Sequence, residues 1–205
     1  YLDIKGYEAN SVQSSERTIK ILSSLDEYLE FGGYPEVVLE KDDDLKQKTL
    51  ENYLDLTIYK DMVERHGIKD TMLVKWLIKS IMSSYTKEIS VNKIYSTLKS
   101  QGRNFSKDEL HRLASHVNDS FFAMYLPRFS YSIRKREPTG KAYLCDIGFA
   151  RLIESSPDIG KKMENTVFIE LIRRQDTGME LFFWKTQSEE VDFVIKKGSK
   201  AIQLI

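Results

Sequence analysis

Apolar residues recur every three or four positions in several stretches of the chain, the spacing that gathers them on one face of an α-helix. Gly32, Gly33 and Pro35 end the first stretch, because glycine suits a helix C-terminus and proline cannot continue a helix. Ser106 and Glu109 form a capping box where the fifth stretch begins. The predicted helices are residues 15–31, 45–65, 72–85, 91–101, 106–118 and 160–174.

Shorter apolar runs between turn residues predict strands. The predicted strands are residues 121–126, 142–145, 179–184, 191–195 and 201–205. The predicted helices are more numerous and longer than the predicted strands, so the pattern predicts an α+β fold that is mostly α.

The middle of the chain has the element order of a winged helix-turn-helix: helix, helix, turn, capped helix and two strands joined by a basic segment. The helix at 106–118 would be the recognition helix, and the segment between the strands would be the wing. Five basic residues lie in or beside that segment, with Glu137 as the only acid. They are Arg128, Arg134, Lys135, Arg136 and Lys141.

Bulk composition adds limits rather than a function. The chain has 205 residues with 31 basic and 31 acidic side chains, so any basic surface must be local. A single cysteine excludes an internal disulfide framework and favours a cytoplasmic protein. No apolar run approaches the ~20 residues that span a bilayer, so no membrane association is expected.

Two acids share one face of a predicted strand near the end of the chain. Glu190 and Asp192 are two positions apart, whereas Val191 and Phe193 point to the other face. A turn and a returning run, residues 201–205, follow. An acidic strand, a tight turn and a returning strand resemble the metal-binding hairpin of the PD-(D/E)XK, or restriction-endonuclease-like, nuclease fold.

That resemblance implies catalytic roles for Glu164, Glu190 and Asp192. Glu164 corresponds to the acid of the helix and Asp192 to the central metal ligand, and both would bind Mg²⁺, which prefers oxygen ligands. The metal would activate water and stabilise charge on phosphate. The returning strand departs from the pattern, because Ile205 takes the lysine position if residues 203–205 are aligned with the acid-x-lysine motif. Otherwise that motif lies beyond Ile205.

Several segments in a fixed order resemble one family: archaeal and bacterial AAA-type, STAND-like ATPases with a C-terminal winged helix and a nuclease-like domain of uncharacterised function. The segments are residues 28–38, 59–61, 141–148, 164–171 and 190–195. The resemblance implies a P-loop ATPase module upstream of Tyr1, with ATP and Mg²⁺ as cofactors of the longer protein. We expect no cofactor in this chain alone, which contains no P-loop motif.

The resemblance also implies a domain division: a helical lid-like segment (1–70), a winged helix domain (71–150) and a truncated nuclease-like α/β domain (151–205). In the lid, Gly33 and Pro35 would form a turn that touches the nucleotide, although a plain helix stop explains them equally well. A start without methionine and an end inside a predicted strand indicate a fragment of a longer protein.

We expect the basic segment to contact DNA, together with Lys107 and Arg112 of the recognition helix. Phosphate contacts supply affinity but little sequence specificity. The expected function is thus a DNA-associating accessory region of an ATPase. The alternatives are a metal-dependent nuclease domain and a non-catalytic scaffold for protein contacts or regulation. Whether the chain is an enzyme, and whether it forms a homo-oligomer, stays open.

Overall fold

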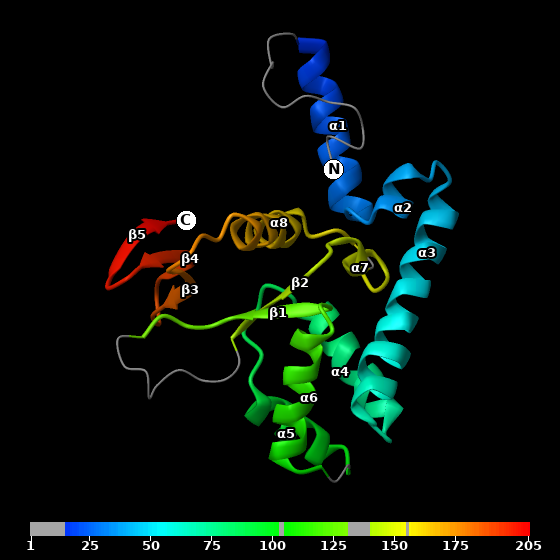
Figure 1. Cartoon of the computed structure of the whole chain (residues 1–205), viewed down its shortest axis with the longest axis vertical. Coiled ribbons are helices and arrows are strands. Elements are labelled where there is room, and N and C mark those ends of the chain that lie inside the picture. The colour runs from blue at the N-terminus through cyan, green and yellow to red at the C-terminus, as the bar shows by residue number, and fades with distance from the viewer. Residues whose placement is uncertain (1–14, 103–104, 131–139, 155) are drawn as a thin grey trace.

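The protein is seen in a computed structural model that describes residues 15–102, 105–130, 140–154 and 156–205 (Figure 1). Helices dominate, and the strands of these described ranges form one two-stranded and one three-stranded sheet, both antiparallel. The predicted fold class, α+β and mostly α, is confirmed.

Four helical segments form the first part of the described chain. They are α1 (Ser15–Phe31), α2 (Pro35–Leu39), α3 (Asp43–Leu56) and the π-helix η1 (Thr57–Glu64). The sequence pattern predicts one regular helix over residues 45–65, but its second half is π-helical, and Ile58 and Met62 lie buried there. The short helix α2 was not predicted, because five residues are too few to show a helical repeat. In Figure 1, α1 projects away from the rest of the molecule.

The next elements follow the order predicted for a winged helix. They are α4 (Thr71–Ser83), α5 (Val91–Ser100), α6 (Lys107–Asp119), β1 (Ala123–Leu126) and β2 (Lys141–Leu144). The predicted cap of α6 is present, because Ser106 Oγ accepts a hydrogen bond from the Glu109 N–H at 3.1 Å. β1 and β2 are antiparallel, with Leu126 opposite Lys141.

The last part of the chain places one helix beside an antiparallel sheet. Its elements are α7 (Gly148–Arg151), α8 (Ile159–Arg173), β3 (Met179–Lys185), β4 (Glu190–Lys197) and β5 (Lys200–Leu204). The short helix α7 was not predicted, and it contacts α1, α3 and α4. β4 is the central strand of the sheet, between β3 and β5.

Among the apolar clusters of the described residues, the two larger ones hold these parts together. The larger runs through α4, α6, β1, β2 and α7, and includes the fully buried Val74, Ile78 and Val117. The second joins α8 to the three-stranded sheet through Phe168 and Phe193. Tyr143 of β2 belongs to this second cluster, so β2 takes part in both. Among the described helices, none is both long and apolar enough to cross a membrane.

Candidate functional site

The acids that the sequence analysis selected meet at one lysine. Lys141 Nζ lies 2.6 Å from Asp192 Oδ1, 2.7 Å from Glu190 Oε1 and 3.1 Å from Glu164 Oε1. We call these four residues the acid–lysine cluster. Its members come from three elements, because Lys141 begins β2, Glu164 lies on α8, and Glu190 and Asp192 lie on β4.

Local packing explains why α8 brings Glu164 to this place. The buried amide of Asn165 pairs with the backbone of Leu144 in β2: its Oδ1 accepts from the N–H and its Nδ2 donates to the carbonyl, both at 2.9 Å. The Tyr143 ring stacks on Phe168 with centroids 4.2 Å apart. These contacts fix α8 against β2, so the Tyr143 hydroxyl donates to Glu164 Oε1 at 2.7 Å.

Burial differs across the cluster. The Lys141 side chain is 4% exposed, whereas Glu190 and Asp192 are 33% and 47% exposed, so the acids are open to solvent on the side of β4. Burial alone would lower the pKa of the Lys141 ammonium. The hydrogen bonds with Asp192 and Glu190 and the charge of Glu164 outweigh burial and raise this pKa. Burial would raise the pKa of Glu190, but Lys141 and Lys185 hold it below its usual value.

The geometry does not fit the Mg²⁺ ion that the nuclease resemblance implies. The space between the three carboxylates holds the Lys141 ammonium at salt-bridge distances from all of them. In the part of the chain that the structure describes, no group of three His, Cys, Asp or Glu side chains is arranged to hold a metal ion. We therefore derive no metal-dependent step for this chain.

The returning strand adds no group to the cluster. β5 pairs with β4 so that Gln203 lies opposite Ile195, and Ile205 exchanges backbone hydrogen bonds with Phe193. Paired residues of an antiparallel sheet share a face, and Phe193 and Ile195 lie on the opposite face of β4 from Asp192. Gln203 and Ile205 thus point away from the acid–lysine cluster.

The described residues that were predicted to contact DNA are spread over α6, β2 and the segment after β1. Arg134, Lys135 and Arg136 lie outside the described residues. Arg128 is exposed, and its guanidinium donates to the carbonyl of Lys185 at the end of β3. Lys141 differs from the prediction: it is buried among carboxylates that attract it more strongly than a distant phosphate would, so we leave it out of the DNA-contacting set.

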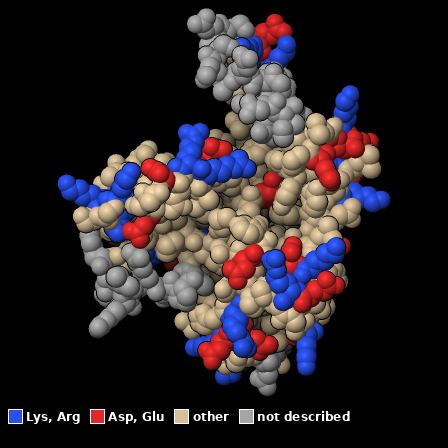
Figure 2. Space-filling model, in the orientation of Figure 1, with Lys and Arg blue, Asp and Glu red and all other residues tan. Residues whose placement is uncertain are grey.

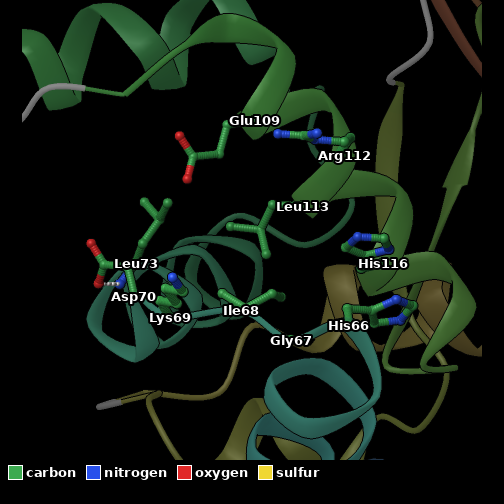
Figure 3. Close-up of a pocket in the computed structure, with 10 residues that line it drawn as sticks. All are labelled: His66, Gly67, Ile68, Lys69, Asp70, Leu73, Glu109, Arg112, Leu113 and His116. Carbon is green, nitrogen blue, oxygen red and sulfur yellow. Dashed lines mark hydrogen bonds between the residues drawn. The ribbon is translucent and has the colours of Figure 1, made fainter.

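The two basic residues of α6 have different surroundings. Lys107 is exposed, with Nζ 5.4 Å from the ring centroid of Tyr95. Arg112 borders a cavity of about 510 Å³ between α6 and the segment 66–73 (Figure 3). Glu109 of α6 and Asp70 line the same cavity, so acidic groups lie beside the predicted recognition surface.

A histidine pair at one end of this cavity was missed by the sequence analysis. The rings of His66 and His116 stack with centroids 3.6 Å apart (Figure 3). Within the described residues, His66 Nε2 and His116 Nδ1 are buried without a hydrogen-bond partner. Burial, followed by the neighbouring His66, lowers the pKa of His116, and Asp119 opposes this effect. Fifty positions separate the two residues, so no local pattern could have revealed the contact.

Asp146, which the sequence analysis also missed, fixes the Gly33–Pro35 turn by hydrogen bonds. Asp146 Oδ2 accepts from the Gly33 N–H at 2.9 Å, and Oδ1 accepts from the Gly148 N–H at 2.8 Å. Gly33 is half-buried, whereas Pro35 is exposed at the start of α2. The signal in the sequence was an acid between Cys145 and Ile147, in an otherwise apolar run.

Comparison with known proteins places the chain among uncharacterised relatives. It is 32% identical to the uncharacterized protein MJ1544 of Methanocaldococcus jannaschii over 203 residues, 98% of this chain and 46% of that protein. It is 28% identical over 215 residues to an uncharacterized protein of Haemophilus influenzae, with 98% of this chain and 52% of that protein covered. The chain thus spans about half the length of these curated relatives. No solved structure matches it.

Two family models match residues 22–205 of the chain. Residues 159–205 match DUF4143, a domain of unknown function found in ATPase-associated proteins. Residues 22–158 match DUF8612, also a domain of unknown function. Because this second match covers more than half of the sequence, the chain belongs to the DUF8612 family.

Proposed function

We propose that the chain is a DNA-associating accessory region that works with an ATPase module outside it. The observation that carries this proposal is the anchoring of the described residues on both sides of the basic segment, residues 131–139. The occurrence of DUF4143 in ATPase-associated proteins supports the ATPase part of the proposal.

The chain just before the basic segment is bound to β3. The Phe183 N–H donates to the Pro127 carbonyl at 3.1 Å, and the Phe129 N–H donates to the Phe183 carbonyl at 2.7 Å. The Arg128 guanidinium adds a hydrogen bond to the Lys185 carbonyl. The chain therefore enters the basic segment from a fixed position beside the three-stranded sheet.

The chain just after the basic segment is bound to the residues between α4 and α5. The Ile89 N–H donates to the Gly140 carbonyl at 2.9 Å, and Ala142 and Lys87 are joined by a backbone hydrogen bond of 3.1 Å. A side chain at residue 140 would collide with the Leu126 carbonyl, which leaves glycine as the residue that fits there. The described residues on both sides of the segment are thus held close to β1.

Fixed flanking residues favour binding to a charged polymer, because preorganisation reduces the conformational entropy that is lost on binding. Arg134, Lys135 and Arg136 supply adjacent positive charges, and such contacts bind phosphates without reading sequence. On the face shown in Figure 2, the described Lys and Arg side chains are interspersed with Asp and Glu. This intermixing favours the basic segment over that broader surface as the contact.

The test is fluorescence anisotropy of a labelled DNA duplex with the protein over a series of salt concentrations. We expect salt-sensitive binding that is weakened when Arg134, Lys135 and Arg136 are all changed to Gln. The slope of log affinity against log salt should fall by about 0.9 for each phosphate contact that is lost.

A matched control changes Lys48, Lys60 and Lys79 to Gln, which removes the same charge from exposed helical positions. The proposal requires the control to bind as the wild type does. Equal losses of DNA affinity in both variants would show that only the net charge of the protein matters. An absence of binding at low salt would overturn the proposed association with DNA.

The ATPase part of the proposal concerns the Gly33–Pro35 turn, which would face the nucleotide in the longer protein. Exposed Pro35 beside a turn that Asp146 holds supports this role. Replacing Pro35 with Ala in the longer protein should raise the KM for ATP. An unchanged KM for ATP would show that the turn does not contact the nucleotide.

The nuclease alternative is not our proposal. Its three acids do meet, but the Lys141 ammonium occupies the space between them. The scaffold alternative depends on the surroundings of Arg134–Arg136, which lie outside the described residues, and stays a hypothesis. The anisotropy experiment described above distinguishes a scaffold from a DNA-binding region, because a scaffold would bind no duplex.

A further inference from the structure

We propose that the ammonium of Lys141 is the resident cation of the acid–lysine cluster, so that the cluster joins strand β2 to α8 and β4 without a metal ion. This proposal concerns the role of the cluster and does not depend on DNA binding. It follows from the failure of the cluster to fit the metal that the nuclease resemblance implies.

The hydrogen-bonding capacity of the ammonium matches its surroundings. A lysine ammonium has three N–H donors and no acceptor. Three carboxylates receive it, from Glu164, Glu190 and Asp192, at 3.1, 2.7 and 2.6 Å. Every donor can therefore be used, and a divalent ion could enter this space only if the ammonium left it.

Burial makes this exchange unfavourable. The Lys141 side chain is almost completely enclosed, and an enclosed charge is strongly destabilising unless it is paired and hydrogen-bonded. Loss of either partner therefore leaves the other charge uncompensated. The acids keep Lys141 charged inside the protein, and Lys141 keeps three neighbouring carboxylates from repelling one another.

The position of the cluster gives it a mechanical role. Lys141 directly follows the anchored residue Gly140 and lies opposite Leu126 of β1. Glu164 and Asp192 belong to α8 and β4, outside the winged-helix elements. The cluster therefore ties the base of the basic segment to the C-terminal α/β part of the chain.

The proposal predicts how the cluster responds when its lysine is removed. Lys141→Met keeps a long side chain. Within the described residues, it leaves Lys185, which binds Glu190 Oε2 at 2.5 Å, as the one ammonium paired with these three carboxylates. Asp192 and Glu190 are partly exposed, so an ion from solvent can reach them. The variant should bind the divalent cation that the wild type excludes, because clustered carboxylates are hard oxygen ligands.

The experiment measures the melting temperature in MgCl₂ and in NaCl of equal ionic strength. We expect the wild type to melt at the same temperature in both salts. Lys141→Met should melt lower in NaCl and regain part of the loss in MgCl₂. Lys185→Met is the matched control, because it removes an ammonium from Glu190 but leaves Lys141 in place, and it should show no gain in MgCl₂.

Two results would overturn the proposal: a specific gain of the wild type in MgCl₂, or a Lys141→Met variant that folds and shows none. If Lys141→Met does not fold, calorimetric titration of the wild type with Mn²⁺ decides. No binding heat supports a resident lysine. Stoichiometric binding that Asp192→Asn abolishes shows instead that the cluster accepts a metal with Lys141 present, and overturns it.

Discussion

The carboxylate of Asp146 binds the backbone N–H of Gly33, a residue 113 positions earlier in the chain, at 2.9 Å. The same carboxylate binds the Gly148 N–H, so it bridges the turn after α1 and the start of α7. One buried side chain thus accepts hydrogen bonds from two backbone N–H groups. This arrangement requires the backbone of the turn to approach Asp146 closely.

Gly32 shows how close that approach is. It has a φ of +80°, and a Cβ added there would overlap Asp146 Oδ1 and press on the Gly148 backbone nitrogen. Gly32→Ala should therefore lower the free energy of unfolding by about 3 kcal/mol, combining left-handed backbone strain with overpacking. Chemical denaturation measures this loss.

Gly67→Ala is the matched control for this prediction. Gly67 has a φ of +61°, but no atom of the described residues lies within 4 Å of an added Cβ. Its loss should be limited to backbone strain, about 1 kcal/mol. Equal losses in the two variants would show that Asp146 exerts no steric constraint on Gly32.

Asp146 should also make stability depend on pH. Burial raises its pKa from 3.8 to about 6, although the N–H groups of Gly33 and Gly148 oppose the shift. Because the folded pKa lies above the unfolded one, the stabilisation is complete below pH 3.8 and is lost as pH rises through about 6.

The measurement compares the free energy of unfolding of the wild type and Asp146→Asn between pH 4 and pH 7. The difference, wild type minus variant, should grow by about 2 kcal/mol as pH falls across this range. Other titrating groups cancel in the comparison. A difference that stays constant with pH would contradict a perturbed Asp146.

Asn165 should be essential for docking α8 on β2. Asn165→Ala leaves the buried N–H and carbonyl of Leu144 without their side-chain partners, which should destabilise the protein by about 3 kcal/mol. Asn52→Ala on the exposed surface of α3 should change stability by at most about 0.5 kcal/mol. Similar effects of both substitutions would mean that the Asn165 amide is not what secures α8.

The stacked pair of His66 and His116 should make stability depend on pH in the opposite sense to Asp146. The pKa of His116 is lowered, first by burial and then by His66, so protonation is resisted in the folded state. Its stabilisation is present above the unfolded pKa of about 6.5 and is lost as pH falls through the folded pKa. The wild type should therefore lose stability on acidification relative to His116→Phe, which keeps the stacked ring.

The control for the histidine prediction is His111→Phe on the same helix. His111 is not one of the residues that line the cavity. The substitution His111→Phe should therefore leave the loss of stability on acidification as it is in the wild type. Thermal melts of the three proteins from pH 7 to pH 5 provide the comparison. If His116→Phe and the wild type lose stability in parallel, the stacked pair is not responsible.

Much of the secondary structure could be predicted because helical periodicity and caps are local. α1, α4 and α6 lie where apolar spacing placed them, and Ser106 caps α6 as expected. The π-helical segment Thr57–Glu64 departs from the prediction, because the residues that pack against a helix determine whether it can widen its turn. The very short α2 and α7 carry too few residues for a periodic signal.

The candidate site divides in the same way. Alternation along one strand placed Glu190 and Asp192 on one face, and sequence alone supplied the acids and the basic segment. Only the tertiary structure revealed that Lys141, which local charge grouped with Arg134–Arg136, turns inward to Glu164 and Asp192 instead. Likewise it alone paired Asp146 with Gly33 and His66 with His116. The reason is physical: periodicity depends on neighbours in the chain, whereas the partner of a buried charge depends on which distant segments the core brings within hydrogen-bonding distance.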